Sequence, residues 1–232
     1  MKTPRLTPAC LVICLTVILC NLGYLSPAVA QENLIINSDF EKDDGTWGMF
    51  VPGESKEKGC EFIYSKESPH EGLSCLEMKS SDLARFSVGP KQLAKKLKIG
   101  ERYRLTFWIR AGENTKSRSN EAFIVRLFIR DVDNQNIAGN QALFIGLNGH
   151  TTIQSPEAGL NLSQLSTGLP SKEWTKVESV FEVPGNESTG AARLNIPEFF
   201  AQYISGSIFL DDISLVQVDK STPLSPSHEK AQ

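Results

Sequence analysis

A long succession of short β-type runs dominates this sequence and leaves few folds open to it. From Asn33 on, runs rich in β-branched and aromatic residues alternate with clusters of Gly, Pro, Asn, Asp and Ser. No amphipathic pattern long enough for a helix of about 12 residues interrupts them. The uneven spacing of the runs favours two packed antiparallel sheets over a closed barrel. We therefore predict an all-β chain that folds as a two-sheet β-sandwich.

The first 30 residues have the pattern of an export signal and are set apart from the fold. Lys2 and Arg5 precede an apolar stretch from Leu11 to Leu19 that is too short to span a bilayer. Ala28-Val29-Ala30 then gives the small-x-small pattern that a signal peptidase cuts. We expect a secreted or periplasmic protein, and no membrane-spanning segment, because no second apolar stretch follows.

The rest of the chain divides into a sandwich domain and a tail. The domain spans residues 31–218, and the tail, 219–232, contains Pro and Ser but no aromatic residue, so we expect it to be disordered. An alternative to cleavage after Ala30 is a lipoprotein anchored through Cys20. The large Leu19 before that cysteine argues against this alternative.

Charge and composition exclude one class of partner. The formal net charge is -3, with 24 Lys and Arg against 27 Asp and Glu, and no basic run stands out. Binding to nucleic acid needs an excess of Lys and Arg on one face, so we expect no nucleic-acid partner. A hydrophobic content of 40% is enough for a sizeable packed core.

Two cysteines remain once the signal is removed. Cys60 and Cys75 flank a segment with two β-rich runs around Ser-Pro-His-Glu-Gly, which predicts a hairpin with the two cysteines across from one another. In an oxidising compartment this arrangement predicts a disulfide. The chain-entropy model gives such a bridge about 3 kcal/mol of stabilisation.

Two runs show their strand alternation residue by residue. In Tyr103–Ala111 and in Ala122–Asp131, one face is apolar and the other mixes aromatic residues with arginines. The residues of interest on the polar faces are Trp108, Arg110, Arg126 and Phe128. Such a face suits sugar recognition, because rings stack on pyranose C–H groups while guanidinium groups bind hydroxyl pairs. The alternative is that loops or a flanking strand simply cover Trp108 and Phe128.

Five motifs, in order along the chain, resemble one known group of domains. They are Asn33–Glu41 followed by Gly45 and Trp47; His70–Ser74; Gly100 with Tyr103–Trp108; Trp174 with Phe181; and Gly206–Leu215, which contains Asp211-Asp212. Together they resemble carbohydrate-binding modules of families 4 and 9. The resemblance implies a galactose-binding-like jelly roll that binds carbohydrate.

The resemblance also implies one structural Ca²⁺ where the first and last strands meet. Glu41, Asp211 and Asp212 occupy the matching positions and offer the oxygen ligands that calcium prefers. Strand alternation places Asp211 on the same face as Phe209 and Ile213, and an inward carboxylate is costly unless it is paired or metal-bound. The alternative is a charged turn with a solvated Asp pair.

A long connection could add ligand contacts. Residues 146–172 are rich in Asn, Gln, Ser, Thr and Gly, and unstructured loops of this length are usually functional or disordered. Asn148 and His150 are the candidates from this stretch.

Motifs of the familiar hydrolases are missing from the sequence. It contains neither Gly-x-Ser-x-Gly nor His-Glu-x-x-His. A pair of glycosidase carboxylates is defined by its spatial separation, so sequence alone does not test for one. We predict an exported, non-catalytic carbohydrate-binding domain. The alternative is an exported structural or adhesive domain that contacts a protein partner; an open groove around the outward aromatics favours sugar, and a flat or covered face favours protein.

Overall fold

The computed structural model describes residues 31–118, 120–130, 142–154, 162–183, 193–194 and 196–227. The predicted signal segment, 1–30, lies outside the described residues, and so do residues 228–232. Within the described ranges, no helix has both the length and the apolar content needed to cross a membrane.

The described part of the chain is almost entirely β-structure, as predicted. Its elements in order are β1 (Trp47–Phe50), the 3-10 helix η1 (Gly53–Ser55), β2 (Glu61–Ser65), β3 (Cys75–Pro90), β4 (Arg102–Ala111), β5 (Lys116–Ser117), β6 (Phe123–Arg130), β7 (Ala142–Ile145), β8 (Thr151–Gln154), β9 (Thr175–Glu182), β10 (Arg193–Leu194) and β11 (Glu198–Val218). All of the strand pairings are antiparallel.

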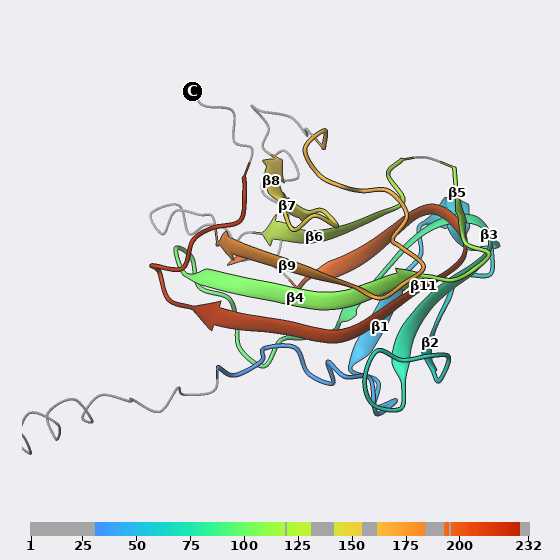
Figure 1. Cartoon of the computed structure of the whole chain (residues 1–232), viewed down its shortest axis with the longest axis horizontal. Coiled ribbons are helices and arrows are strands. Elements are labelled where there is room, and N and C mark those ends of the chain that lie inside the picture. The colour runs from blue at the N-terminus through green and yellow to red at the C-terminus, as the bar shows by residue number, and fades with distance from the viewer. Residues whose placement is uncertain are drawn as a thin grey trace, which may run out of the picture. The chain divides into compact units, whose positions relative to one another are not determined.

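Two long strands, β3 and β11, run through both layers of a sandwich (Figure 1). The second half of β11 pairs with β4, and β9 and β2 complete this first sheet in the order β9-β4-β11-β3-β2. The first half of β11 pairs with β6, which gives a second sheet in the order β1-β3-β11-β6-β7-β8. Short strands β5 and β10 add to β11 and β6. This topology confirms the predicted antiparallel jelly-roll sandwich.

β11 is interrupted by two bulges. The pairing register shifts between Ala201 and Ile204, and again between Asp211 and Ser214. A further shift, between Ile204 and Gly206, has its extra residues on β3. Tyr203 and Asp212, one in each interruption, have φ values of 49° and 47°. A left-handed conformation is uncommon for residues other than glycine, and a bulge re-aims side chains that regular alternation would place elsewhere.

The core between the sheets follows the predicted alternation. On β4, Tyr103, Leu105, Phe107 and Ile109 are each at most 1% exposed. Phe123, Val125 and Leu127 of β6 are buried in the same cluster. Complete burial of one such side chain stabilises the fold by about 1.5–3 kcal/mol, so this cluster accounts for much of the fold's stability.

The predicted disulfide is wrong, although the hairpin that suggested it is present. Cys60 and Cys75 are both free thiols. In the β2–β3 pairing, Cys75 lies opposite Ser65, whereas Cys60 precedes Glu61 at the other end of the strand. Five residues along a strand span about 16 Å, far beyond the Cα separation of about 6 Å that a disulfide needs. Burial raises the pKa of the Cys75 thiol to about 12, so it stays protonated.

The start of the tail is ordered, contrary to the expectation for residues 219–232. Ser225 N donates to Val180 O of β9 over 2.9 Å, and Thr151 N of β8 donates to Pro226 O over 2.9 Å. Arg102 Nη1 also donates to Thr222 O. Because β8 and β9 are edge strands, their free backbone groups pair with the passing tail. Residues 219–227 therefore link the edges of the two sheets.

Candidate functional site

The four outward residues predicted to share a face lie on two different sheets. Trp108 and Arg110 are on β4, which pairs with the second half of β11. Arg126 and Phe128 are on β6, which pairs with the first half. Each pair points away from the core of its own sheet, so the two pairs lie on opposite sides of the sandwich. A single combined site is thus excluded.

The outer face at Trp108 is closed by the β2–β3 connection, residues 66–74, called here the hairpin loop. The His70 ring stacks on the Trp108 ring at 3.8 Å with an interplanar angle of 19°. Trp174 meets the same histidine edge-on at 5.9 Å and donates from Nε1 to Ser68 O. The predicted alternative, that a loop covers the tryptophan, therefore holds at Trp108.

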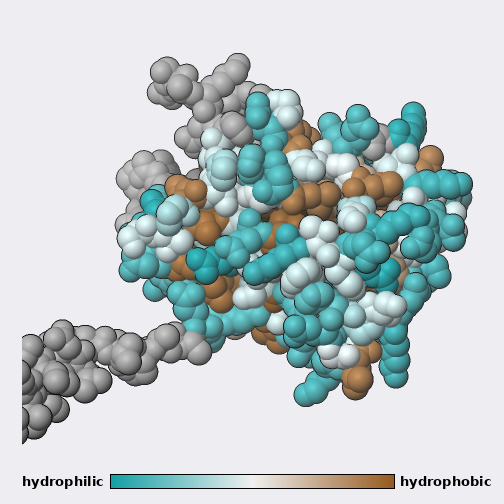
Figure 2. All heavy atoms as spheres, viewed as in Figure 1, coloured by the Kyte–Doolittle hydropathy of each residue, from teal (hydrophilic) through white to brown (hydrophobic). Residues whose placement is uncertain are grey.

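Arg110 is part of the same closure. Its side chain is 9% exposed, its guanidinium lies 3.8 Å from the centre of the Phe209 ring, and Nη2 donates to Glu67 O over 2.8 Å. These contacts use the arginine to hold the hairpin loop against β11. On the side viewed in Figure 2, where β4, β9 and β11 face the reader, hydrophobic residues form small groups scattered among hydrophilic ones.

Three carboxylates, all predicted metal ligands, converge on the hairpin loop. Glu41 Oε1 accepts hydrogen bonds from Leu73 N and Ser74 N at 2.7 and 3.2 Å. Asp211 Oδ2 accepts from His70 N at 2.9 Å, and Asp212 Oδ2 lies 2.7 Å from the His70 ring nitrogen Nδ1. Glu41 and Asp211 thereby fix the loop through its backbone, and Asp212 through the His70 side chain.

Asp211 is buried as expected, but not between the sheets. It lies opposite Trp108 in the β4–β11 register and therefore points to the outer face, beneath the hairpin loop. The second bulge of β11 breaks the alternation, so Asp211 does not share a face with Ile213. The pKa of Asp211 is raised to about 6, chiefly by burial and also by the nearby charge of Asp212, while hydrogen bonds from backbone N–H groups act in the opposite direction.

The oxygen and nitrogen atoms grouped at the hairpin loop are of the kinds that bind a hard divalent cation. Ligand atoms of His70, Glu71 and Asp212 all lie within 4.8 Å of one another, and the neighbouring Asp211 adds a buried carboxylate. Burying acidic groups side by side is unfavourable, and a bound divalent ion would offset the cost. The backbone N–H bonds to Asp211 and Glu41 compete for the oxygen lone pairs that such an ion would use.

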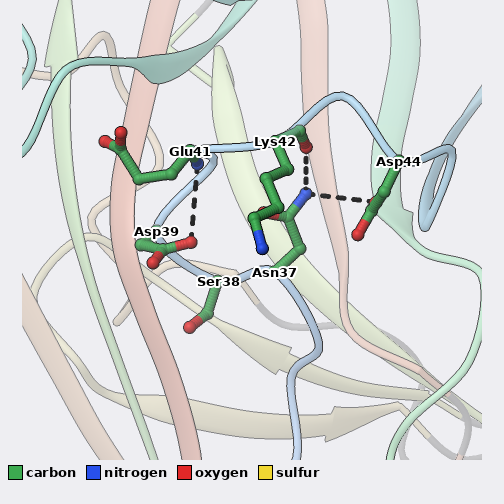
Figure 3. Close-up of a pocket in the computed structure, with 6 residues that line it drawn as sticks. All are labelled: Asn37, Ser38, Asp39, Glu41, Lys42 and Asp44. Atoms are coloured by element: carbon green, nitrogen blue, oxygen red, sulfur yellow. Dashed lines mark hydrogen bonds between the residues drawn. The ribbon is translucent and has the colours of Figure 1, made fainter.

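A separate acidic pocket lies in the turn before β1 (Figure 3). It measures about 290 Å³ and is lined by Asn37, Ser38, Asp39, Glu41, Lys42 and Asp44. Asn37 Nδ2 donates to Lys42 O and to Asp44 Oδ1, and Asp39 Oδ1 accepts from Glu41 N. Hydrogen bonds from Thr46 lower the pKa of Asp44. The side chains of Asn37, Asp39 and Asp44 therefore form hydrogen bonds with other residues of the same turn.

The outer face of the second sheet, named the open face below, lies away from the hairpin loop and carries a second apolar cluster that includes Leu165 and Phe200. Arg126 donates from Nε and Nη2 to Glu198 Oε2 at 3.0 and 2.9 Å. Its guanidinium lies 4.6 Å from the centre of the Phe128 ring and 4.2 Å from that of Phe200. Arg126, Phe128 and Glu198 are half-buried, whereas Phe200 is 4% exposed and packs with Ile124, Phe144 and Leu165. Phe128 packs against this cluster on the same face.

Asn148 and His150 lie in the tight turn between β7 and β8. Asn148 Nδ2 donates to Gln164 O, and its Oδ1 accepts from His150 N and Ser166 N. A Cβ on Gly149 would meet Glu178 O of β9, so the turn lies against the first sheet. Asn148 therefore stabilises a turn, and the sequence prediction of one long loop missed strand β8.

Tyr203 and Arg85 are residues of the open face for which the sequence analysis predicted no role. Tyr203 lies in the first bulge of β11. The run Ala84–Val88 shows alternation, but nothing in the sequence indicates that it pairs with the first half of β11.

Comparison by sequence identifies no relative, since neither a protein-family model nor a curated protein matches. Solved structures do match. A cyclase from Fischerella sp. TAU has 12% identity and a TM-score of 0.52, over 83% of this chain and 100% of the cyclase. The enzymatically active domain of tailspike protein 4 from bacteriophage CBA120 has 13% identity and a TM-score of 0.53, over 80% of this chain and 21% of the tailspike.

A carbohydrate-binding module is similar at a lower score. The C-terminal family 22 module of Clostridium thermocellum Xyn10B has 12% identity and a TM-score of 0.49, over 82% of this chain and 97% of the module. At 12–13% identity, the two matches with TM-scores of 0.52 and 0.53 show a similar fold and no more, and the narrower resemblance to families 4 and 9 is not confirmed. A similar fold at such identities does not assign a function.

Proposed function

We propose that this chain is an exported, non-catalytic carbohydrate-binding domain whose site is the outer face of the second sheet. The observation that carries the proposal is the arrangement of Arg126, whose guanidinium is held between two aromatic rings and fixed by Glu198. A planar donor and flat rings, prepositioned on a rigid sheet, are what binding of a pyranose requires.

The chemistry of sugar binding fits these side chains. Pyranose rings present C–H groups that pack on an aromatic face, and Phe128 supplies a half-exposed ring for that contact. Sugar hydroxyls need both donors and acceptors, which Arg126 and Glu198 provide side by side. Because their mutual contacts already hold these groups, little side-chain entropy is lost on binding.

We propose in addition that a divalent cation, calcium by its oxygen preference, stabilises the hairpin loop. Asp212, His70 and Glu71, whose ligand atoms lie within 4.8 Å of one another, would hold the ion, with the buried carboxylate of Asp211 beside them. The predicted ligand Glu41 is outside this group and binds the backbone of Leu73 and Ser74. The ion would neutralise the buried acidic charge. Its role here is structural, because the loop covers the first sheet, on the opposite side from the proposed sugar site.

The test is affinity electrophoresis of the purified chain in gels containing neutral or acidic polysaccharides. We expect retardation by at least one polysaccharide, and loss of retardation in Phe128→Ala and Arg126→Ala. The matched control is Arg104→Ala, which removes an arginine on the first sheet that is ion-paired to Glu178 at 3.4 Å. If no polysaccharide retards the protein, the proposal fails and contact with a protein partner becomes the function to examine.

A further inference from the structure

Cationic and aromatic side chains alternate in one continuous series on the outer face of the second sheet. In order along the face they are Arg118, Tyr203, Arg85, Phe200, Arg126 and Phe128. We call this series the arginine–aromatic ladder. It extends from the proposed sugar contacts on β6 across β11 to β3 and the segment after β5.

Every step of the ladder is within cation–π distance. The Arg118 and Arg85 guanidinium carbons lie 5.6 and 5.5 Å from the centre of the Tyr203 ring. Arg85 also lies 5.5 Å from Phe200. Contacts of this kind within about 6 Å are attractive and restrain each guanidinium beside its ring. The ladder therefore presents planar donors at fixed positions.

The first ring of the ladder, Tyr203, is held in place by a strained backbone. Tyr203 has φ 49°, in the first bulge of β11, between register positions Ala201 and Ile204. Arg118 N donates to Tyr203 O over 3.0 Å and secures the bulge. A left-handed tyrosine costs roughly 1–3 kcal/mol, and such costs concentrate at functional sites. The bulge is what places this ring between Arg85 and Arg118.

The charge of the ladder is only partly compensated. Glu198 pairs with Arg126 at 2.9 Å, and Glu54 lies 3.6 Å from Arg85. Arg118 is exposed and has no ion pair within the described ranges. Screening limits exposed charges to about 10 Å at 0.1 M salt, so this local excess of positive charge acts on a ligand despite the chain's net charge of -3.

We propose that the ladder binds an anionic polysaccharide, one whose pyranose rings carry carboxylate or sulfate groups. This inference rests on the proposed function and specifies its ligand class. Guanidinium groups bind such anions through two parallel hydrogen bonds, and a neutral glycan would leave the positive charge of Arg118 without a partner. Tyr203 and Phe128, the two half-buried rings of the ladder, stack on the sugar rings, so both parts of the ladder are used at once.

The experiment compares two forms of one polymer. Binding of the purified chain to polygalacturonate and to its fully methyl-esterified form is measured by affinity electrophoresis, with dextran sulfate as the sulfate-bearing arm and poly-L-glutamate as an acidic polymer without sugar. The variants are Arg118→Ala and Tyr203→Ala, with Arg104→Ala as the charge-matched control on the other sheet.

We expect polygalacturonate or dextran sulfate to bind at least tenfold more tightly than the methyl ester and poly-L-glutamate. Arg118→Ala should weaken binding about fivefold, which is the effect of losing an exposed ion pair. Tyr203→Ala should weaken it about tenfold, because a stacking ring is lost, and Arg104→Ala should leave it unchanged. Binding of the methyl ester as strong as that of polygalacturonate would overturn the anionic inference and leave the proposed function standing. Equal binding of poly-L-glutamate would overturn it in favour of an acidic peptide, and binding to no polysaccharide would overturn both proposals.

Discussion

The outer faces of the two sheets carry the same kinds of side chain and differ in what covers them. On the first sheet, Trp108 is covered by His70 of the hairpin loop and Arg110 is almost fully buried. On the second sheet, Phe128 and Arg126 are half-buried, as Trp108 is, but Phe128 packs on the apolar cluster around Phe200 and not under the hairpin loop. An outward aromatic residue beside an arginine therefore predicts a contact, but the partner can be a loop of the same chain.

The two bulges of β11 serve these two faces in parallel. Tyr203, in the first bulge, joins the arginines of the open face, and Asp212, in the second, contacts His70 of the hairpin loop. Both residues have a left-handed backbone. The comparison suggests that the first bulge serves ligand binding and the second serves loop closure.

Removal of the metal is the change for which we expect the largest difference between the two faces, with stability affected on one side and binding unaffected on the other. If a divalent ion stabilises the hairpin loop, EDTA lowers the free energy of unfolding by about 2.7 kcal/mol at a metal concentration one hundred times its Kd. Polysaccharide binding below the melting temperature should not change, because the loop is on the opposite side. Differential scanning calorimetry with and without EDTA measures the effect. An unchanged melting temperature would remove the metal from this account.

Loss of the covered tryptophan should affect stability alone. Trp108→Ala removes the stack on His70, and we expect it to destabilise the fold by about 2 kcal/mol, less than the 3–5 kcal/mol of a fully buried aromatic residue. Urea denaturation measures this change. A variant that unfolds at the wild-type urea concentration and no longer binds polysaccharide would show that the face at Trp108 is the site.

The raised pKa of Asp211 predicts a pH dependence confined to the closed face. Its folded pKa of about 6 is above the ordinary value of 3.8, so the folded state holds the proton more tightly. The stabilisation of the folded state by this tighter proton binding is fully present below about pH 4. It is lost as the pH rises through 6, and the free energy of unfolding then falls by up to about 1.4 kcal/mol per pH unit.

Asp211→Asn provides the reference for this measurement. The free energy of unfolding of wild type minus that of Asp211→Asn, measured in EDTA, should fall between pH 4 and pH 6. A difference that stays constant or rises over this range would show that Asp211 is not protonated in the folded state.

The cysteines should give the smallest effect. Since Cys60 and Cys75 are too far apart in register to bond, reductant should leave the melting temperature unchanged. In the native protein, alkylation should modify the half-buried Cys60 slowly and Cys75 not at all, because the latter is buried with a pKa of about 12. A lower melting temperature in reductant would indicate a disulfide.

Much of the fold could be predicted from local alternation, and the site could not. The core positions on β4 and β6 follow a period of two, which the sequence shows directly. The bulges break that period inside β11, so the direction of Asp211 was predicted wrongly and Tyr203 was missed. Which strands become neighbours depends on pairing between distant segments. For that reason Trp108 and Phe128 were expected on one face.

The most direct test of the central claim pairs one variant from each face. Tyr203→Ala and Trp108→Ala are compared with wild type for polygalacturonate affinity and for melting temperature under the same conditions. We predict that Tyr203→Ala loses about tenfold in affinity and melts close to wild type, whereas Trp108→Ala melts lower and keeps its affinity. The reverse pattern, with affinity lost in Trp108→Ala and kept in Tyr203→Ala, would contradict the assignment of the open face as the binding site.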